Sequence, residues 1–156
     1  MNNNKLSTMI EGIREPYEPV RFIIIDDDDI SLMAVKRSIK KLKIANPVTT
    51  AKDGVEAMEI LHGLIGRDGK LPPCILTLDL NMPKMGGLEF LDKIRSNSTF
   101  SKLIVFVLTT SNTPSDIARA YEKNIAGYIV KGNETETLSV ALELLNDYSQ
   151  LVVLPS

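Results

Sequence analysis

Five short runs of apolar residues, many of them β-branched, recur along the chain and alternate with segments of helical period. Such runs are typical of strands that are buried on both faces of a sheet. Strands that alternate with helices predict a parallel sheet covered by helices on both sides, which is a doubly wound α/β fold. The predicted strands span residues 21–25, 47–51, 74–78, 103–108 and 126–130.

The segments between these runs predict helices, and three of them carry an apolar stripe at helical spacing. Thr113 is expected to cap the fourth helix, with Pro114 at its first position. Asn133 is expected to cap the last helix, with Glu136 three residues further on. The second helix should end at about Ile65, because glycines and prolines follow. The stripes consist of Leu32, Val35, Ile39 and Leu42, of Ile117, Ala120 and Tyr121, and of Leu138, Ala141, Leu142 and Leu145.

The length of 156 residues, of which 44% are hydrophobic, predicts a single globular domain with a substantial core. We expect a flexible N-terminal tail at 1–18, the domain at 19–149 and a C-terminal tail at 150–156. Within the domain, the glycine- and proline-containing stretch 62–73 is expected to be a surface insertion. The apolar sequence LVVLP in the C-terminal tail is expected to pack on the last helix, although a homodimer contact is left open.

Charge and hydropathy exclude several classes of protein. The net charge of −2 gives no global basic surface for nucleic acid or for an anionic membrane. No apolar stretch is long enough for membrane insertion, and the N-terminus lacks the apolar core of a signal peptide, so we expect a cytoplasmic protein. The lone Cys74 is expected to be a buried thiol, and the lone His62 is assigned no role.

Polar residues follow four of the predicted strands. Four aspartates, residues 26–29, end the first strand, while Asp79, Thr109 and Lys131 end the third, fourth and fifth. In a doubly wound sheet of order 2-1-3-4-5 the ends of strands 1 and 3 meet at the switch point, where ligands bind. Two of the four aspartates with Asp79 would form an oxygen-rich site for a hard divalent cation, most naturally Mg²⁺. The other two can cap the following helix.

Each of these signals has an ordinary structural explanation when it is taken alone. An aspartate run is commonly a solvated turn or a helix cap, and Thr109 or Lys131 could be an unremarkable strand-end residue. The conjunction of four matches at strand ends, in the right order, favours a functional site.

Together these residues resemble the receiver domains of two-component response regulators, over roughly residues 20–149. That resemblance implies a flavodoxin-like (βα)5 fold. The insertion before the third strand and the sequences LDLNMP and VLTTS are also similar to stand-alone receivers that partner phytochrome-type histidine kinases. The resemblance rests on the acid pair Asp26 and Asp27, on Asp79 with the turn residues Asn81, Met82, Pro83, Gly86 and Gly87, and on Thr109, Tyr128 and Lys131.

The resemblance implies a phosphoacceptor chemistry. Asp79 would accept a phosphoryl group from a kinase phosphohistidine. Asp27 would ligate Mg²⁺ directly, Asp26 would do so through water, and Asn81 would offer its backbone carbonyl. The chain would catalyse its own phosphotransfer and dephosphorylation, and it would not be an enzyme that turns over a small-molecule substrate.

The resemblance also implies a switch. Lys131 would help to neutralise the phosphoryl charge, Thr109 would donate its hydroxyl to a phosphoryl oxygen, and Tyr128 would turn inward. The chain would be a single-domain response regulator of a two-component phosphorelay. Its partners would be a sensor histidine kinase or phosphotransfer protein and a downstream protein, because residues 150–156 are too few for an output domain.

Two other functions share part of this sequence pattern. A haloacid-dehalogenase-like phosphatase also uses a strand-end aspartate, but it needs a second acid two residues later, where this chain has Asn81. A phosphorylation-independent receiver-like interaction module is the alternative, although every acceptor, metal and switch position is filled. One departure from the family pattern is Gly132, where a proline usually follows the lysine, and we expect a trans Lys131–Gly132 bond.

Overall fold

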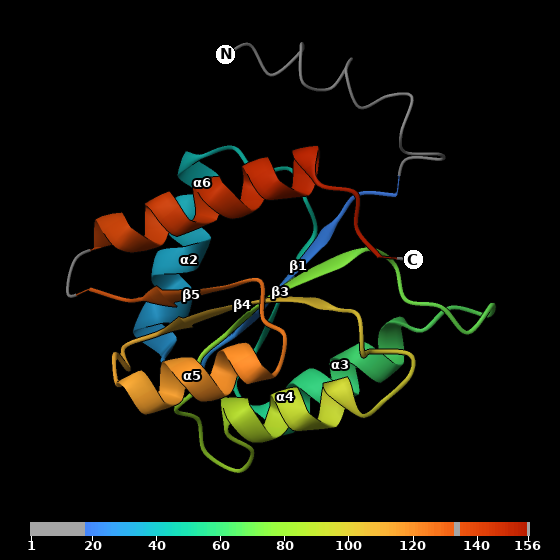
Figure 1. Ribbon diagram of the computed structural model, residues 1–156. Helices are drawn as coiled ribbons and strands as arrows, with labels where there is room; N and C mark the ends of the chain where they lie inside the picture. Colours follow the sequence, from blue (N-terminus) through green and yellow to red (C-terminus); the bar gives the residue numbers. More distant parts are fainter. Residues whose placement is uncertain (1–17, 133–134, 156) are drawn as a thin grey trace.

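The computed structural model describes residues 18–132 and 135–155, and five parallel strands form the centre of the molecule. The strand order is β2-β1-β3-β4-β5, as predicted from the sequence. Figure 1 labels β1, β3, β4 and β5. The strands are β1 (Arg21–Ile25), β2 (Val48–Ala51), β3 (Cys74–Leu78), β4 (Ile104–Thr109) and β5 (Gly127–Val130).

Helices cover both faces of the sheet. In Figure 1, α2 and α6 lie on one face, and α3, α4 and α5 lie on the other. Each face has its own apolar core, because the buried side chains of a strand point alternately to the two sides. The helices are α2 (Asp29–Lys41), α3 (Gly54–Leu64), α4 (Gly87–Arg95), α5 (Pro114–Glu122) and α6 (Thr135–Leu151).

The predicted helix caps agree with the structure where it describes them, but Tyr121 does not belong to a buried stripe on α5, because its side chain is exposed. The hydroxyl oxygen of Thr113 caps α5 by accepting a hydrogen bond from the backbone N–H of Asp116 at 3.3 Å, and Pro114 begins that helix. Asp28 caps α2, and Asp29 lies in its first turn. The predicted cap Asn133 lies outside the described residues.

Element bounds differ from the predictions by small shifts. Strands β2 and β5 begin one residue later than expected, at Val48 and Gly127, and β4 is shifted by one residue. Helix α3 continues to Leu64, so the first three residues of the 62–73 stretch are helical. Helix α6 extends to Leu151, two residues beyond the predicted end of the domain. The domain bounds themselves stay a prediction.

Register places the strand ends side by side. Ile25 of β1 pairs with Ala51 of β2 and with Leu78 of β3. The backbone N–H of Asp79 donates to the carbonyl of Ile25 at 2.9 Å, which continues the ladder by one residue. The residue after β1 and the residue after β3 are therefore neighbours at the same edge.

Gly87 is required where the chain turns from β3 into α4. A Cβ atom at this position would lie 2.5 Å from the carbonyl oxygen of Asp79 and 2.7 Å from the Cα atom of Leu80. Both contacts are with backbone, so no side-chain rotation could relieve them. The first turn of α4 therefore packs directly against the backbone of Asp79. In the part of the chain that the structure describes, no helix is long and apolar enough to span a membrane.

Candidate functional site

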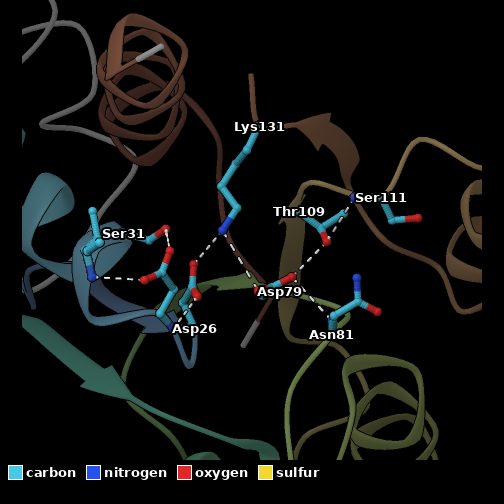
Figure 2. A network of polar contacts seen from close by, with 9 residues as sticks. Asp26, Ser31, Asp79, Asn81, Thr109, Ser111 and Lys131 are labelled. Carbon is cyan, nitrogen blue, oxygen red and sulfur yellow. Dashed lines mark hydrogen bonds and ion pairs between the residues drawn. The ribbon is translucent and has the colours of Figure 1, made fainter. Parts of the chain in front are cut away.

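The carboxyl edge of the sheet brings together the polar residues that follow the strands. Figure 2 shows Asp26, Asp79, Thr109 and Lys131 pointing toward one another from the carboxyl ends of β1, β3, β4 and β5. Asp26, Asp79 and Thr109 are 5%, 7% and 0% exposed, so this cluster of charged and polar groups is buried. A buried charged group is costly unless partners surround it, so the contacts of each group decide what the site can do.

Asp79 lies at the centre of the site. Its Oδ1 atom accepts a hydrogen bond from the Thr109 hydroxyl at 2.7 Å and a longer one from the backbone N–H of Asn81 at 3.3 Å. Its Oδ2 atom lies 3.9 Å from the ammonium nitrogen of Lys131. The two oxygens therefore differ, since one is held by neutral donors and the other faces a cation.

Lys131 forms its shorter contact with Asp26. The Lys131 ammonium donates to Asp26 Oδ2 at 2.6 Å, and the backbone N–H of Asp28 donates to Asp26 Oδ1 at 2.9 Å. Burial raises the pKa of Asp26, and Lys131 opposes that rise. Lys131 thus bridges the ends of β1 and β3. The Lys131–Gly132 peptide bond is trans, as predicted.

Three carboxylates share this edge with one ammonium group. Oxygen atoms of Asp26, Asp27 and Asp79 lie within 4.8 Å of one another, and Asp27 is exposed to solvent. The set carries more negative charge than Lys131 can neutralise, and all of its ligand atoms are hard oxygens. This donor set fits a small divalent cation such as Mg²⁺, which binds through a few carboxylates and keeps several waters.

Ser111 connects Thr109 to Tyr128, and the sequence analysis did not identify it. Its carbonyl accepts a hydrogen bond from the Tyr128 hydroxyl at 2.9 Å, and its backbone N–H lies 3.5 Å from the Thr109 hydroxyl oxygen. The Tyr128 ring packs against the apolar core on the α3, α4 and α5 side of the sheet. Burial raises the pKa of Tyr128. A backbone carbonyl has no sequence signature, so only the position two residues after Thr109 could have indicated Ser111.

The geometry agrees with a family match. Residues 22–143 match the model of the response regulator receiver domain. The chain belongs to this family. It is therefore a receiver-domain response regulator of two-component systems, and receiver domains of this family bind Mg²⁺.

A comparison with an individual relative also identifies a response regulator. Over 125 residues the chain is 34% identical to the nitrate/nitrite response regulator protein NarL of Escherichia coli strain K12; the match covers 80% of the chain and 54% of NarL.

Among solved structures, that of the phosphorylated cyanobacterial phytochrome response regulator RcpA superposes with a TM-score of 0.76 at 27% identity. That superposition covers 87% of this chain and 98% of RcpA. The Mn²⁺-bound form of Rcp1, a response regulator of Synechocystis, gives a TM-score of 0.75 at 27% identity and covers 89% of this chain and 100% of Rcp1.

Proposed function

We propose that Asp79 is the phosphoacceptor of this receiver and that its phosphorylation depends on Mg²⁺. The observation that carries the proposal is the pair of oxygens on Asp79, of which Oδ1 is held by Thr109 and Oδ2 faces Lys131. A carboxylate held in this way is oriented before the reaction, and orientation is a large part of what phosphoryl transfer requires.

In the transfer step an oxygen of Asp79 attacks the phosphorus of a phosphohistidine. The new bond joins phosphorus to oxygen, the phosphorus–nitrogen bond breaks, and the imidazole nitrogen keeps the electron pair. Lys131, 3.9 Å from Oδ2, is placed to attract the oxygens of the incoming group. The Thr109 hydroxyl can turn from Oδ1 to a phosphoryl oxygen, because a hydroxyl rotates freely.

Asp26, Asp27 and the backbone carbonyl of Asn81 would hold Mg²⁺ beside Asp79, with Asp26 acting through water. A cation bound there would neutralise the charge of the phosphoryl oxygens and of the clustered carboxylates. The Mn²⁺-bound form of Rcp1 supports a divalent metal in a relative of this fold. In this chain the three carboxylates within 4.8 Å of one another support the same assignment.

The phosphoryl donor would be a sensor histidine kinase or a phosphotransfer protein. Similarity to phytochrome response regulators supports a kinase of the phytochrome class, and a downstream protein would bind the switched surface. A cytoplasmic location stays a prediction.

Labelling with a small phosphoryl donor tests the acceptor. Acetyl phosphate with Mg²⁺ should add one phosphoryl group to the intact chain, as measured by mass spectrometry, and excess chelator should prevent the reaction. Asp79→Asn should abolish labelling, whereas the matched Asp68→Asn, in the exposed loop after α3, should not change it. Wild-type labelling of the Asp79→Asn variant would refute the assignment, and a chain that never labels would support the phosphorylation-independent alternative.

The same labelling experiment also tests which residues bind the metal. Asp27→Ala should raise the Mg²⁺ concentration for half-maximal labelling by about tenfold or more, because a charged ligand is lost. The matched Asp28→Ala removes a neighbouring acid that caps α2 and should change that concentration by less. Equal effects of the two substitutions would show that the acidic run acts only through its net charge.

A further inference from the structure

The loop between β4 and α5 is held at Ser111 by three separate contacts. The Ser111 backbone N–H lies 3.5 Å from the Thr109 hydroxyl oxygen, and the Ser111 carbonyl accepts from Tyr128. The third contact comes from α5, where the Ser111 hydroxyl donates to Asp116 Oδ2 at 2.6 Å. The first two contacts connect Thr109 to Tyr128 through Ser111, and the third connects Ser111 to α5.

The hydrogen bond between Ser111 and Asp116 is the strongest of the three by its type and length. An O–H···O⁻ bond of this length is charge-assisted and is stronger than the bond between two neutral groups. The N–H contact of Ser111 to Thr109, at 3.5 Å, is at the long end of the range for a hydrogen bond. The position of Ser111 is therefore set more by Asp116 than by Thr109.

Asp116 is itself fixed within α5. Its backbone N–H donates to the Thr113 hydroxyl oxygen at 3.3 Å, so the residue belongs to the capped first turn of the helix. Among the described residues, its carboxylate forms no ion pair with a cationic side chain. In a helix cap of the usual kind an acid at this place reaches back to the backbone of the cap residue, but Asp116 holds a loop side chain instead.

We propose that Asp116 is a positioning residue that holds Ser111 through its hydroxyl and so sets where the Ser111 carbonyl meets the Tyr128 hydroxyl. The proposal rests on the proposed function, since it concerns how the state of Asp79 reaches Tyr128. When Thr109 donates to a phosphoryl oxygen, its side chain shifts toward that oxygen, so its Oγ1 atom moves relative to the N–H of Ser111. Because Asp116 holds Ser111, that movement displaces the whole loop between β4 and α5. The contact between the Ser111 carbonyl and the Tyr128 hydroxyl then moves with the loop.

The test measures the response of Tyr128 to a phosphoryl mimic. Amide and ring chemical shifts of Tyr128 are recorded in the full chain with Mg²⁺, before and after addition of beryllofluoride. Ser111→Ala and Asp116→Ala should each reduce the change in the Tyr128 shifts by about twofold or more, because each removes the charge-assisted bond. The double variant should show no further decrease, because both substitutions break the same bond.

Two further variants separate this role from helix capping. Asp116→Asn keeps an acceptor oxygen and should retain most of the wild-type response, whereas a response as low as that of Asp116→Ala would overturn the hydrogen-bond role. Ser115→Ala, an exposed change in the same turn, should leave the response unchanged. If Asp116→Ala weakens α5 itself, Ser111→Ala still decides the question, because Ser111 lies in the loop outside the helix.

The outcomes distinguish the two proposals. A wild-type chain that shows neither labelling at Asp79 nor a shift at Tyr128 overturns both. If the wild-type chain responds and the Ser111→Ala and Asp116→Ala variants respond as strongly as the wild type, only the role of Asp116 is overturned. Additive effects of the two substitutions overturn it as well, since the residues would then act through different contacts.

Discussion

Two polar clusters in this molecule differ in how completely their charge is neutralised. One surrounds Arg95, and the other consists of the carboxylates of Asp26, Asp27 and Asp79. The Arg95 guanidinium, at the end of α4, donates to the carbonyl oxygens of Ser101, Leu103, Lys123 and Asn124 at 2.7 to 3.1 Å. The carboxylates of Asp26, Asp27 and Asp79 lie close enough to repel one another, and the Lys131 ammonium pairs with Asp26 and Asp79. The cation has its partners within the chain, whereas the anions leave an excess of charge that a ligand can neutralise.

The difference separates a structural charge from a functional one. Burial lowers the pKa of Arg95 and raises the pKa of Asp26, so burial disfavours the charged form of both groups. At Arg95 four carbonyls offset that cost, and the folded state gains a link between the ends of α4 and α5. At the carboxylates the cost is only partly offset, which is typical of a site that binds a cation or a charged substrate.

The largest expected effect is the loss of stability when Arg95 is replaced. Arg95→Met keeps most of the apolar stem but removes every donor, so four carbonyls lose a charged partner. We expect the free energy of unfolding to fall by about 3 kcal/mol, since hydrogen bonds to charged groups contribute about 1.5–3 kcal/mol each and exposed carbonyls regain water. Urea denaturation measures the change. Arg119→Met, an exposed arginine on α5, should change stability by less than about 0.5 kcal/mol.

A smaller effect is expected when the functional cluster receives its ligand. Mg²⁺ at ten times its dissociation constant should raise the free energy of unfolding of the wild-type chain by about 1.4 kcal/mol, because only the folded state assembles the site. Denaturation with and without Mg²⁺, at constant ionic strength, measures this gain. Asp27→Ala should lose most of it. An equal gain from a monovalent salt would show that screening of the carboxylates, and no bound ion, stabilises the protein.

The smallest expected effect has the opposite sign to that of Arg95→Met. Asp26→Asn removes a buried charge that burial disfavours, and Lys131 keeps Asp79 as a partner at 3.9 Å. Without divalent metal we expect a gain of about 0.5 kcal/mol in the free energy of unfolding, because removal of the charge relieves desolvation and repulsion. The same variant should bind Mg²⁺ more weakly. A loss of stability comparable with that of Arg95→Met would contradict the distinction between the two clusters.

The sequence predicted the functional cluster better than the structural one. Asp26, Asp79, Thr109 and Lys131 each follow an apolar run, and the carboxyl ends of parallel strands meet at one edge, so their proximity could be inferred from order alone. Arg95 had no such signal, because its acceptors are backbone carbonyls, which every residue carries. The Asp116 contact had no sequence signal either, because an acid in the first turn of a helix is typical of an ordinary cap.

The hydrogen bonds of Arg95 also hold the C-terminal end of α5, so a movement of its first turn would tilt the helix about that end. They hold the carbonyls of Lys123 and Asn124, directly after the last turn of the helix, while Ser111 holds the first turn through Asp116. Nine residues at 1.5 Å each give a helix roughly 13 Å long, so a displacement of about 1 Å at the first turn tilts it by roughly 4° about its far end. A protein that binds along α5 would therefore meet a gradient of movement, largest near Pro114 and almost absent near Glu122.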